Sequence, residues 1–438
     1  MKAVNLEEVI RYFDSQKALT PANAAEWECF YTDTNRNEVE KIITEFCHKP
    51  KGHKILFGGH SGNGKSTELN RLVVRQEIKD NFSPIKFDVK EVLNPNDIEI
   101  VELLLVICLN LLEFASGKSV SLSPHIVDEF KKIEGFFHEK LKIESSKKDS
   151  TTTGAGAGIE GSIGAKVPFL GLKSIFSAKM AAQHDSRKIV REEYRPRLTE
   201  IIDLIHDLII SINNVPEISP VLIIIDGLDR VPLTVAKKLF VEDGQNIAMI
   251  KYASMLITVP ISIIHSMESS LVSGIIGNIK PLANIRIKSR DGQPDKGNLE
   301  ILNNCVLNRM EKDLITDNAL KLAIDYSGGV FRTLVELISK AAVNSKTLGG
   351  SKIDDGSMEE AIRELKIEKS RPITRKHLDL LLEIDNNKTF LSEMDNEKLE
   401  LLHGLFVLEY INGGEWYDIN PLLQDRLKEY KKHAKKEG

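Results

Sequence analysis

The residues best placed to do chemistry form one glycine-rich run, and their order predicts a phosphate-binding loop. The run has the pattern G-x-x-x-x-G-K-[ST] and consists of Gly59, His60, Ser61, Gly62, Asn63, Gly64, Lys65, Ser66 and Thr67. In such a loop, backbone N–H groups surround the β-phosphate, and the N-terminus of the next helix adds positive potential. We expect Lys65 to reach the β- and γ-phosphates and the Ser66 hydroxyl to bind Mg²⁺. A chance glycine-rich turn is the alternative.

The segments on either side of this run favour phosphate binding over a chance turn. Residues 54–57 are mostly apolar and β-prone, and residues 66–77 carry Leu69, Leu72 and Val73 at helical spacing. A strand before the loop and a helix after it are the context in which this motif binds a nucleotide. The sequence therefore predicts that the chain binds a nucleoside triphosphate.

An acidic cluster after a second apolar strand supplies a candidate metal ligand. Residues 221–225 are five consecutive aliphatics, which is typical of a strand buried on both faces, and Asp226 follows them. We expect Asp226 to hold Mg²⁺ opposite the loop. The water-orienting Glu that commonly follows such an Asp is replaced by Gly227, so Asp229 is the nearest acid. Asp229 either orients water or caps the helix that begins near Pro232.

Two further polar residues are candidates for sensing the γ-phosphate. Thr258 lies at the end of an expected strand over 253–259, where it would point at the attacking water or simply close the strand. Gly328 and Gly329 open a helix, and Arg332 follows three residues later. This spacing can aim the guanidinium at the γ-phosphate, and a solvated helix arginine is the alternative.

The elements that carry these residues predict the fold class: α/β, a P-loop parallel sheet with helices on both faces, followed by an all-α lid and a winged-helix-like C-terminal domain. We expect strands at 54–58, 84–89, 221–225, 253–259 and 284–288, and helices at 97–115, 123–142, 187–213 and from about 297 to 345. The predicted parts are an N-terminal helical segment (1–50), the P-loop domain (51–292), the lid (293–370) and the C-terminal domain with its basic tail (371–438).

Residues 144–185 interrupt this pattern inside the P-loop domain. Residues 145–164 are rich in Ser, Thr, Gly and Ala, and apolar residues then alternate with polar ones as far as Met180. The alternation predicts a two-stranded hairpin with one apolar face, and a disordered linker is the alternative. A hairpin would need a neighbouring subunit, a partner protein or a membrane surface to cover that face.

The composition excludes some classes of protein. The chain has 438 residues, 42% of them hydrophobic and 28% charged, with a net charge of −5, so no overall basic field attracts nucleic acid. The four cysteines have no CxxC spacing and fit a reduced, cytoplasmic protein. The longest apolar stretch, 98–115, contains Glu99, Glu102 and Glu113, which favours a buried helix over an integral membrane segment.

The C-terminal region contains features that argue for DNA binding and features that argue against it. Asn412, Gly413 and Gly414 lie between aromatic and β-branched runs and predict a hairpin. The helix before it, 392–403, carries Glu393, Asp395, Glu397 and Glu400, which would repel phosphates. The basic residues of the tail, Arg426, Lys428, Lys431, Lys432, Lys435 and Lys436, either contact nucleic acid or form a solvated helix end. DNA therefore stays an alternative partner that is not favoured.

Residues 59–67, 226–229, Thr258 and 327–332 together resemble the AAA+/STAND superclass of P-loop ATPases. Within it, the chain looks most like origin-recognition-type and NACHT-like members, and its Asp-Gly-Leu-Asp-Arg strand end is similar to the KAP group. The resemblance covers about 30–345. It implies ATP and Mg²⁺ as ligands, Asp226 on the metal, Thr258 as sensor 1 and Arg332 as sensor 2. Residues 36–38 are similar to the segment near adenine.

One departure from that family concerns the arginine finger. Ring-forming members carry it between the sensor 1 strand and the last strand, but residues 260–285 contain no Arg. Arg230, Arg286 or Arg290 would have to take its place. This difference fits a nucleotide switch better than a ring motor.

The resulting expectation is an ATP-binding, slowly hydrolysing switch of AAA+/STAND type that controls assembly or a partner. Its partners would be further copies of the chain, in a homo-oligomer, or an effector protein, and bacterial defence is a setting implied only by the resemblance. Two alternatives remain: a DNA-binding ATPase of origin-recognition or transposon type, and an inactive ATP-binding scaffold.

Overall fold

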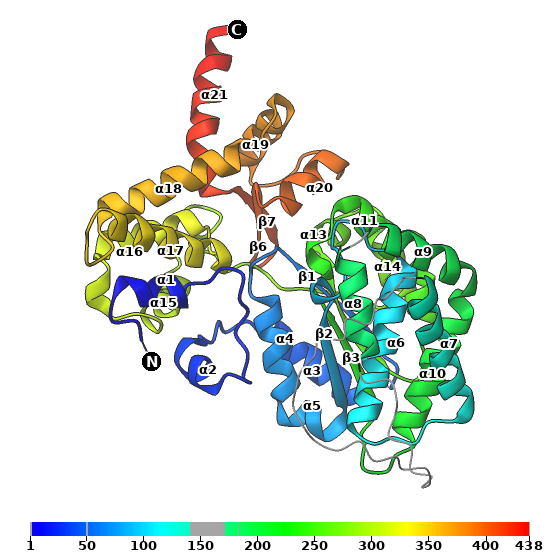
Figure 1. The fold of residues 1–438 in the computed structure, drawn as a ribbon. Coiled ribbons are helices and arrows are strands. Elements are labelled where there is room, and N and C mark those ends of the chain that lie inside the picture. The colour runs from blue at the N-terminus through cyan, green and yellow to red at the C-terminus, as the bar shows by residue number, and fades with distance from the viewer. Residues whose placement is uncertain (1, 50, 141–170, 183, 438) are drawn as a thin grey trace.

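The structure, a computed structural model, describes residues 2–49, 51–140, 171–182 and 184–437. It consists of a sheet domain, a helical lid and a C-terminal unit that lies above both, from which the last helix, α21, projects (Figure 1). The three parts are built around different apolar clusters. This arrangement leaves the phosphate loop where the three parts meet.

The sheet domain contains a five-stranded sheet in the order β2-β3-β4-β1-β5. The strands are β1 (Lys54–Gly59), β2 (Ser83–Asp88), β3 (Val221–Asp226), β4 (Ser254–Pro260) and β5 (Asn278–Pro281). All neighbouring strands are parallel, as predicted. Their carboxyl ends therefore meet at one edge, which is where ligands bind in open sheets of this kind.

Helices cover both faces of the sheet because side chains alternate along each strand. Ile55 and Phe57 of β1 are buried in the cluster that includes α3, α4 and α5, whereas Leu56 is buried on the other face, in the cluster of α6, α7 and α10. These helices span Glu38–His48 (α3), Lys65–Val74 (α4), Gln76–Asn81 (α5), Ile100–Gly117 (α6), Pro124–Lys140 (α7) and Leu198–Asn213 (α10). Short helices complete the domain: α11 (Leu233–Lys237), α12 (Gly244–Met249), α13 (Ile261–Ile264) and α14 (Ser269–Ile275).

Helix α6 is a core helix of this domain. Among the described residues it alone is long and apolar enough to cross a membrane by length and composition, and 78% of it is buried inside the fold. Its one fully buried charge, Glu102, pairs with Arg191 at 2.9 Å. The prediction of a buried helix here is confirmed.

One prediction for the insertion and one for the helix that follows it are wrong where the structure describes them. Residues 176–180 form no strand, because they lie in α8 (Leu172–Ala182). Leu172, Phe176 and Met180 recur every four residues and are all buried, which is helical spacing. The expected helix over 187–213 is interrupted: α9 (His184–Tyr194) ends in a 3-10 turn, Arg195–Arg197, before α10. The remainder of the predicted hairpin, 144–170, lies outside the described residues.

The strand predicted at 284–288 is also wrong. The fifth strand is β5, and the chain after it runs irregularly toward the lid. Ile285 and Ile287 alternate because they pack into the apolar cluster of the lid. Their spacing therefore reflects burial of an extended connector and not membership of the sheet.

The lid is all-helical, as predicted. It consists of α15 (Lys296–Leu307), α16 (Asp317–Ser327), α17 (Phe331–Thr347) and α18 (Asp355–Ser370). The N-terminal helix α1 (Leu6–Tyr12) packs into the same cluster through Leu6 and Val9. Helix α2 (Ala24–Phe30) follows, and α3 belongs to the sheet. The first 50 residues thus run from the lid to the sheet domain.

The C-terminal unit contains two helices, a hairpin and a final helix, in that order. It contains α19 (Arg375–Asn387), α20 (Asn396–His403), the antiparallel pair β6 (Val407–Ile411) and β7 (Glu415–Ile419), and α21 (Gln424–Glu437). Its apolar cluster includes Ile261 of α13, which belongs to the sheet domain. The unit is therefore docked on the sheet domain through a shared core.

Candidate nucleotide site

The phosphate loop connects β1 to α4 in a conformation that its glycines make accessible. Gly62 has φ +85° and Gly64 has φ +99°, both in the left-handed region that side chains disfavour. A Cβ on Gly62 would lie 2.6 Å from the Cβ of Arg332 in the lid. The loop backbone can therefore approach the lid this closely only because residue 62 has no side chain.

Lys65 is buried at the centre of the loop and pairs with Asp229. Its Nζ lies 2.9 Å from Asp229 Oδ2 and donates to the carbonyl oxygens of Gly59 at 2.9 Å and His60 at 2.8 Å. Burial lowers the pKa of Lys65 below its ordinary value. Burial raises and the Lys65 ammonium lowers the pKa of Asp229, and the net shift is downward, so Asp229 is ionised. Lys65 and Asp229 therefore form a buried ion pair at the phosphate loop.

Ser66 and Asp226 lie together as the predicted metal ligands would. The Ser66 hydroxyl donates to Asp226 Oδ1 at 3.2 Å, and the Gly227 N–H donates to the same oxygen at 2.8 Å. A hydroxyl beside a carboxylate is the oxygen donor set that Mg²⁺ prefers. Lys86 of β2 was not predicted to lie here, and its Nζ is 3.2 Å from Asp226 Oδ2. A bound Mg²⁺ would have to compete with that ammonium for the carboxylate.

Gly227 takes the place of the missing glutamate for a physical reason. Its φ is +89°, and a Cβ there would lie 2.2 Å from Asp88 Oδ1 of the neighbouring strand. No side chain fits at this position without displacing Asp88. Asp229 is consequently the carboxylate of this segment that lines the pocket beside Lys65 and Ser66.

Thr258 is held inside the sheet edge. Its hydroxyl accepts from the Leu228 N–H at 3.1 Å and donates to the Ile225 carbonyl at 3.3 Å, and the residue is fully buried. These two bonds tie the end of β4 to the turn that carries Asp229. This geometry agrees with a threonine that closes the strand.

Three arginines line the same pocket as Lys65: Arg230, Arg309 and Arg332. Arg332 of α17 donates from Nη1 to Ser61 Oγ at 2.8 Å, and its backbone N–H donates to the Gly62 carbonyl at 3.1 Å. Arg230 lines the pocket too, and its buried Nε has no hydrogen-bond partner among the described residues. Burial and the charge of Arg230 lower the pKa of Arg332 to about 10. Two guanidiniums that repel each other in a partly buried pocket form a site for an anion.

The other predicted arginines lie elsewhere. Arg36 is behind the loop, where its Nη1 donates to the carbonyls of Asn63 at 2.9 Å and Ala283 at 3.0 Å. Arg286 pairs with Asp295 at 2.6 Å. Arg290 donates to the Asn387 carbonyl at 3.2 Å. Of the three arginines named as finger candidates, only Arg230 therefore reaches the pocket, and it does so within its own chain.

One wall of the pocket was not predicted from the sequence. This wall comes from the N-terminal segments 14–19 and 30–34, with Arg309 and Phe331 from the lid. No spacing pattern marks these residues, because they gather only when the N-terminal segment packs against the lid. They close the pocket beside the phosphate loop, where the base and sugar of a nucleotide would lie.

The hairpin of the C-terminal unit contacts the phosphate loop directly. The Glu409 N–H donates to His60 Nε2 at 2.8 Å, and the Tyr410 hydroxyl donates to the Gly328 carbonyl at 2.6 Å. Burial lowers the pKa of His60 to about 3, so its ring is neutral and can accept this bond. Strand β6 thus bridges the loop and the Gly-Gly turn that precedes Arg332.

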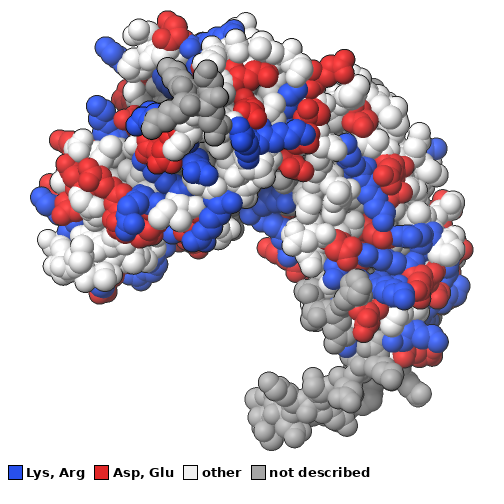
Figure 2. All heavy atoms as spheres, turned by 90° about the horizontal axis from the view of Figure 1, so that it is seen from above, with Lys and Arg blue, Asp and Glu red and all other residues white. Residues whose placement is uncertain are grey.

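The helix expected to enter a DNA groove packs one face against the sheet domain. Helix α20 lies against α13, and its Asn396 accepts from Lys237 Nζ at 3.1 Å. In the tail, Lys431 pairs with Asp385 at 2.6 Å. Lys and Arg are interspersed with Asp and Glu over the face seen from above (Figure 2). Neither the helix nor that face presents a continuous basic surface.

A first prediction concerns the contact between His60 and Glu409. Replacing His60 with leucine leaves the buried Glu409 N–H without an acceptor, which should weaken docking of the hairpin by about 1–3 kcal/mol. Hydrogen–deuterium exchange of the β6 peptide should then speed up by about 5- to 150-fold. His60→Gln keeps an acceptor at a similar reach and is the matched control. Unchanged protection in His60→Leu would show that this bond does not hold the hairpin.

Comparisons with known proteins give remote similarity only. The chain matches no protein-family model and none of the curated proteins. Among solved structures, it is similar to the Aeropyrum pernix ORC2 protein in its ADPNP–ADP complexes, with 12% identity, a TM-score of 0.43, and 96% of each chain covered. The A. pernix ORC1 protein in complex with DNA gives 11% identity and a TM-score of 0.39, with 98% of each chain covered.

A third similarity, to the Thermotoga maritima RuvB Holliday junction branch migration motor, has 12% identity and a TM-score of 0.35, and covers 90% of this chain and 95% of that one. All three TM-scores are below 0.5 and all three identities are 12% or lower.

Proposed function

We propose that this chain binds ATP with Mg²⁺ between the sheet domain and the lid, hydrolyses it slowly, and uses the bound state as a switch. The observation that carries the proposal is the convergence of Lys65, Arg230 and Arg332 on one pocket. They come from the phosphate loop, the end of β3 and the lid. With Lys17 and Arg309 the lining holds five basic residues against three acidic ones, Asp14, Glu68 and Asp229, of which Asp229 pairs with Lys65. A triphosphate supplies the negative charge that this excess of cations favours.

The residues of the chain have separate tasks in this proposal. Lys65 leaves Asp229 to bind the β- and γ-phosphates, and the backbone of residues 59–65 surrounds them. Ser66 and Asp226 would hold Mg²⁺, which neutralises phosphate charge when bound. Arg332 joins the lid to the γ-phosphate. Because Arg332 already touches Ser61 and Gly62, a small displacement of the phosphate loop is enough to move α17.

Slow hydrolysis follows from the same geometry. Gly227 leaves no carboxylate directly after Asp226, and the Thr258 hydroxyl is occupied by two internal bonds. Asp229 is left as the group that can orient water, and it can do so only after Lys65 has turned to the phosphates. Charge neutralisation is therefore well provided and water activation is weak, which suits a switch better than a motor.

The output of the switch would be the C-terminal unit. Its β6 strand contacts His60 of the loop and Gly328 of the turn before Arg332, so either end of the nucleotide site can displace it. Release of the unit would expose α13 and α20 to a second copy of the chain or to an effector protein. The acidic, packed α20 gives no specific support to the DNA-binding alternative.

Titration of the full chain with a fluorescent ATP analogue, with and without Mg²⁺, tests the nucleotide site. We expect saturable binding that ATP displaces and that Mg²⁺ strengthens, with GTP as the competitor that reports base preference. The same samples should be sized by light scattering, since a nucleotide-dependent change of mass supports the switch. Absence of displaceable binding would refute the proposal.

A second prediction concerns Arg332 as the link between nucleotide and lid. In Arg332→Ala the affinity for ATP should fall by about 10- to 100-fold, because a hydrogen bond to a charged group contributes about 1.5–3 kcal/mol. The affinity for ADP should change far less, because the guanidinium is placed for the γ-phosphate. Lys340→Ala, on the same helix but outside the pocket, is the control. Equal losses for ATP and ADP would rule out γ-phosphate sensing.

A further inference from the structure

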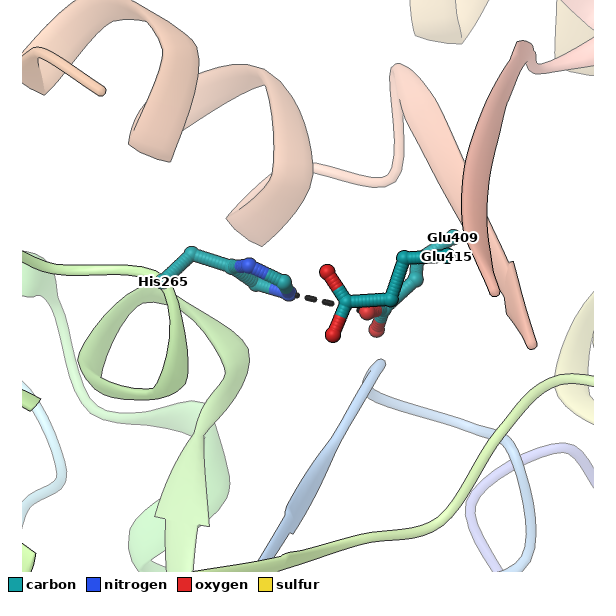
Figure 3. Close-up of side chains that lie close together, drawn as sticks. All are labelled: His265, Glu409 and Glu415. Carbon is teal, nitrogen blue, oxygen red and sulfur yellow. Dashed lines mark ion pairs between the residues drawn. The ribbon is translucent and has the colours of Figure 1, made fainter. Parts of the chain in front are cut away.

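A cluster of three potential metal ligands lies where the C-terminal hairpin meets the sheet domain. His265 directly follows α13, Glu409 is on β6 and Glu415 begins β7, and one ligand atom from each lies within 4.8 Å of the others. The imidazole of His265 points toward both carboxylates (Figure 3). His265 belongs to the sheet domain, and Glu409 and Glu415 belong to the C-terminal unit. The three residues are therefore too far apart in the sequence to form a recognisable motif.

His265 and Glu409 form a buried ion pair without a well-aligned hydrogen bond. His265 Nε2 is 3.0 Å from Glu409 Oε1, and the side chains are only 8% and 3% exposed. Neither atom has a well-aligned hydrogen-bond partner, although the distance allows one. Two donor atoms 3.0 Å apart can both bind one metal ion at about 2.1 Å, and a shift of about 0.4 Å would bring them to the spacing of a tetrahedral site.

The other side of the histidine ring is arranged as an outer coordination shell. The Tyr417 hydroxyl lies 3.4 Å from His265 Nδ1 and donates to Glu415 Oε2 at 3.4 Å. A metal-binding histidine commonly directs its second nitrogen to such a group, which fixes the tautomer and the ring orientation. Tyr417 therefore holds His265 and Glu415 in one orientation with the Nε2 lone pair directed inward.

We propose that His265, Glu409 and Glu415 bind a divalent transition-metal ion, with Zn²⁺ the best fit. One imidazole and two carboxylates match the nitrogen and oxygen donors that Zn²⁺ accepts, and a water would complete four ligands. Ca²⁺ and Mg²⁺ prefer oxygen ligands alone and fit an imidazole poorly. The site is distinct from the nucleotide pocket, whose lining contains none of the three residues.

The position of the site gives the ion a structural role. Glu409 contributes its carboxylate to the cluster and its backbone N–H to His60 of the phosphate loop. An ion here would join α13 to both strands of the hairpin and hold β6 on the loop. Occupancy by the metal would therefore set how easily the C-terminal unit separates from the sheet domain.

The test is metal binding by the full-length chain after treatment with a chelator, in the absence of nucleotide. Titration with Co²⁺, a spectroscopic substitute for Zn²⁺, should give about one bound ion per chain with visible absorption bands of low coordination number. Zn²⁺ should displace the Co²⁺ and raise the melting temperature. Tyr417→Phe should weaken the affinity by about 10- to 100-fold, as loss of an outer-shell partner does.

Three variants decide the outcome. His265→Gln and Glu415→Gln should each abolish the Co²⁺ spectrum, and Glu415 is exposed enough that its variant should fold. His53→Gln is the control, because His53 forms a 2.9 Å pair with Glu45, whose other oxygen takes Lys280 at 2.7 Å. Wild type that binds no more Co²⁺ than His265→Gln would overturn the proposal and leave an interdomain ion pair. Because nucleotide is absent, this result is independent of the ATP proposal.

Discussion

Replacing Lys65 with alanine is expected to lower the affinity for ATP by about 100-fold or more, the largest binding effect of any single change in the pocket. The Lys65 side chain is only 2% exposed and is the one cation of the pocket that the loop itself supplies. Its removal deletes charge-assisted hydrogen bonds to the phosphates. It also leaves the ionised Asp229 beside them without its counter-charge, so an attraction is lost and a repulsion remains.

The double variant Lys65→Ala/Asp229→Asn separates these two contributions. Removal of the carboxylate charge should recover part of the lost affinity, while the hydrogen bonds from the ammonium stay absent. Calorimetric titration with ATP and Mg²⁺ measures all three proteins on one scale. Lys54→Ala, at the opposite end of β1 from the loop, controls for general disturbance of the strand. Binding by Lys65→Ala within about threefold of wild type would place the triphosphate elsewhere.

The sequence predicted the strands correctly where the hydrophobic pattern of a segment matches the place that the segment takes in the fold. The loop, β3 and β4 follow from a phosphate motif and from aliphatic runs long enough to be buried on both faces. The fifth strand was not predicted, because Asn278–Pro281 is a short edge strand that contains Lys280 and Pro281 and has no apolar alternation. The alternation sits instead at Ile285 and Ile287, which pack into the lid. Alternation alone does not distinguish a sheet from a buried connector.

The insertion illustrates a different ambiguity. Phe176 and Met180 are separated by four residues, which satisfies both the two-residue period of a strand and the turn of a helix. Leu172 extends the series by another four residues and fits both periods. Ser174 and Ala178 settle the question, because a strand would bury them on the same face as Leu172, Phe176 and Met180, whereas both are exposed.

The residues of the candidate site also divide into those that the sequence could group and those that only packing brings together. The positions of Lys65, Ser66, Asp226 and Asp229 depend on one loop and one strand end, so spacing along the chain was enough to group them. Lys86, the N-terminal wall at 14–19 and the His60–Glu409 contact depend on how separate segments pack. Arg230 was considered only as a finger for another subunit. Its place in the pocket of its own chain follows from the turn after β3, which the sequence pattern does not specify.

Asp229 is the residue for which binding and hydrolysis should respond in opposite directions. In Asp229→Asn, single-turnover ATP hydrolysis should fall by about 10²- to 10⁴-fold, the usual range for loss of a group that handles the proton of the attacking water. The affinity for ATP should rise, because Lys65 no longer has a carboxylate 2.9 Å away that competes with the phosphates. No purely structural role predicts this pair of changes.

The thermal stability of Asp229→Asn should also reflect the loss of the ion pair between Lys65 and Asp229. Breaking a buried ion pair by removing one charge costs about 3–5 kcal/mol, so the melting temperature of Asp229→Asn without nucleotide should fall. ATP then restores a partner for Lys65, and the rise in melting temperature on adding ATP should exceed that of wild type. Asp88→Asn is the matched control, since Asp88 abuts Gly227 but does not line the pocket, and its hydrolysis should stay near wild type. If Asp229→Asn gains affinity yet hydrolyses ATP at the wild-type rate, Asp229 serves only to hold Lys65, and the chain binds ATP without a carboxylate that orients water.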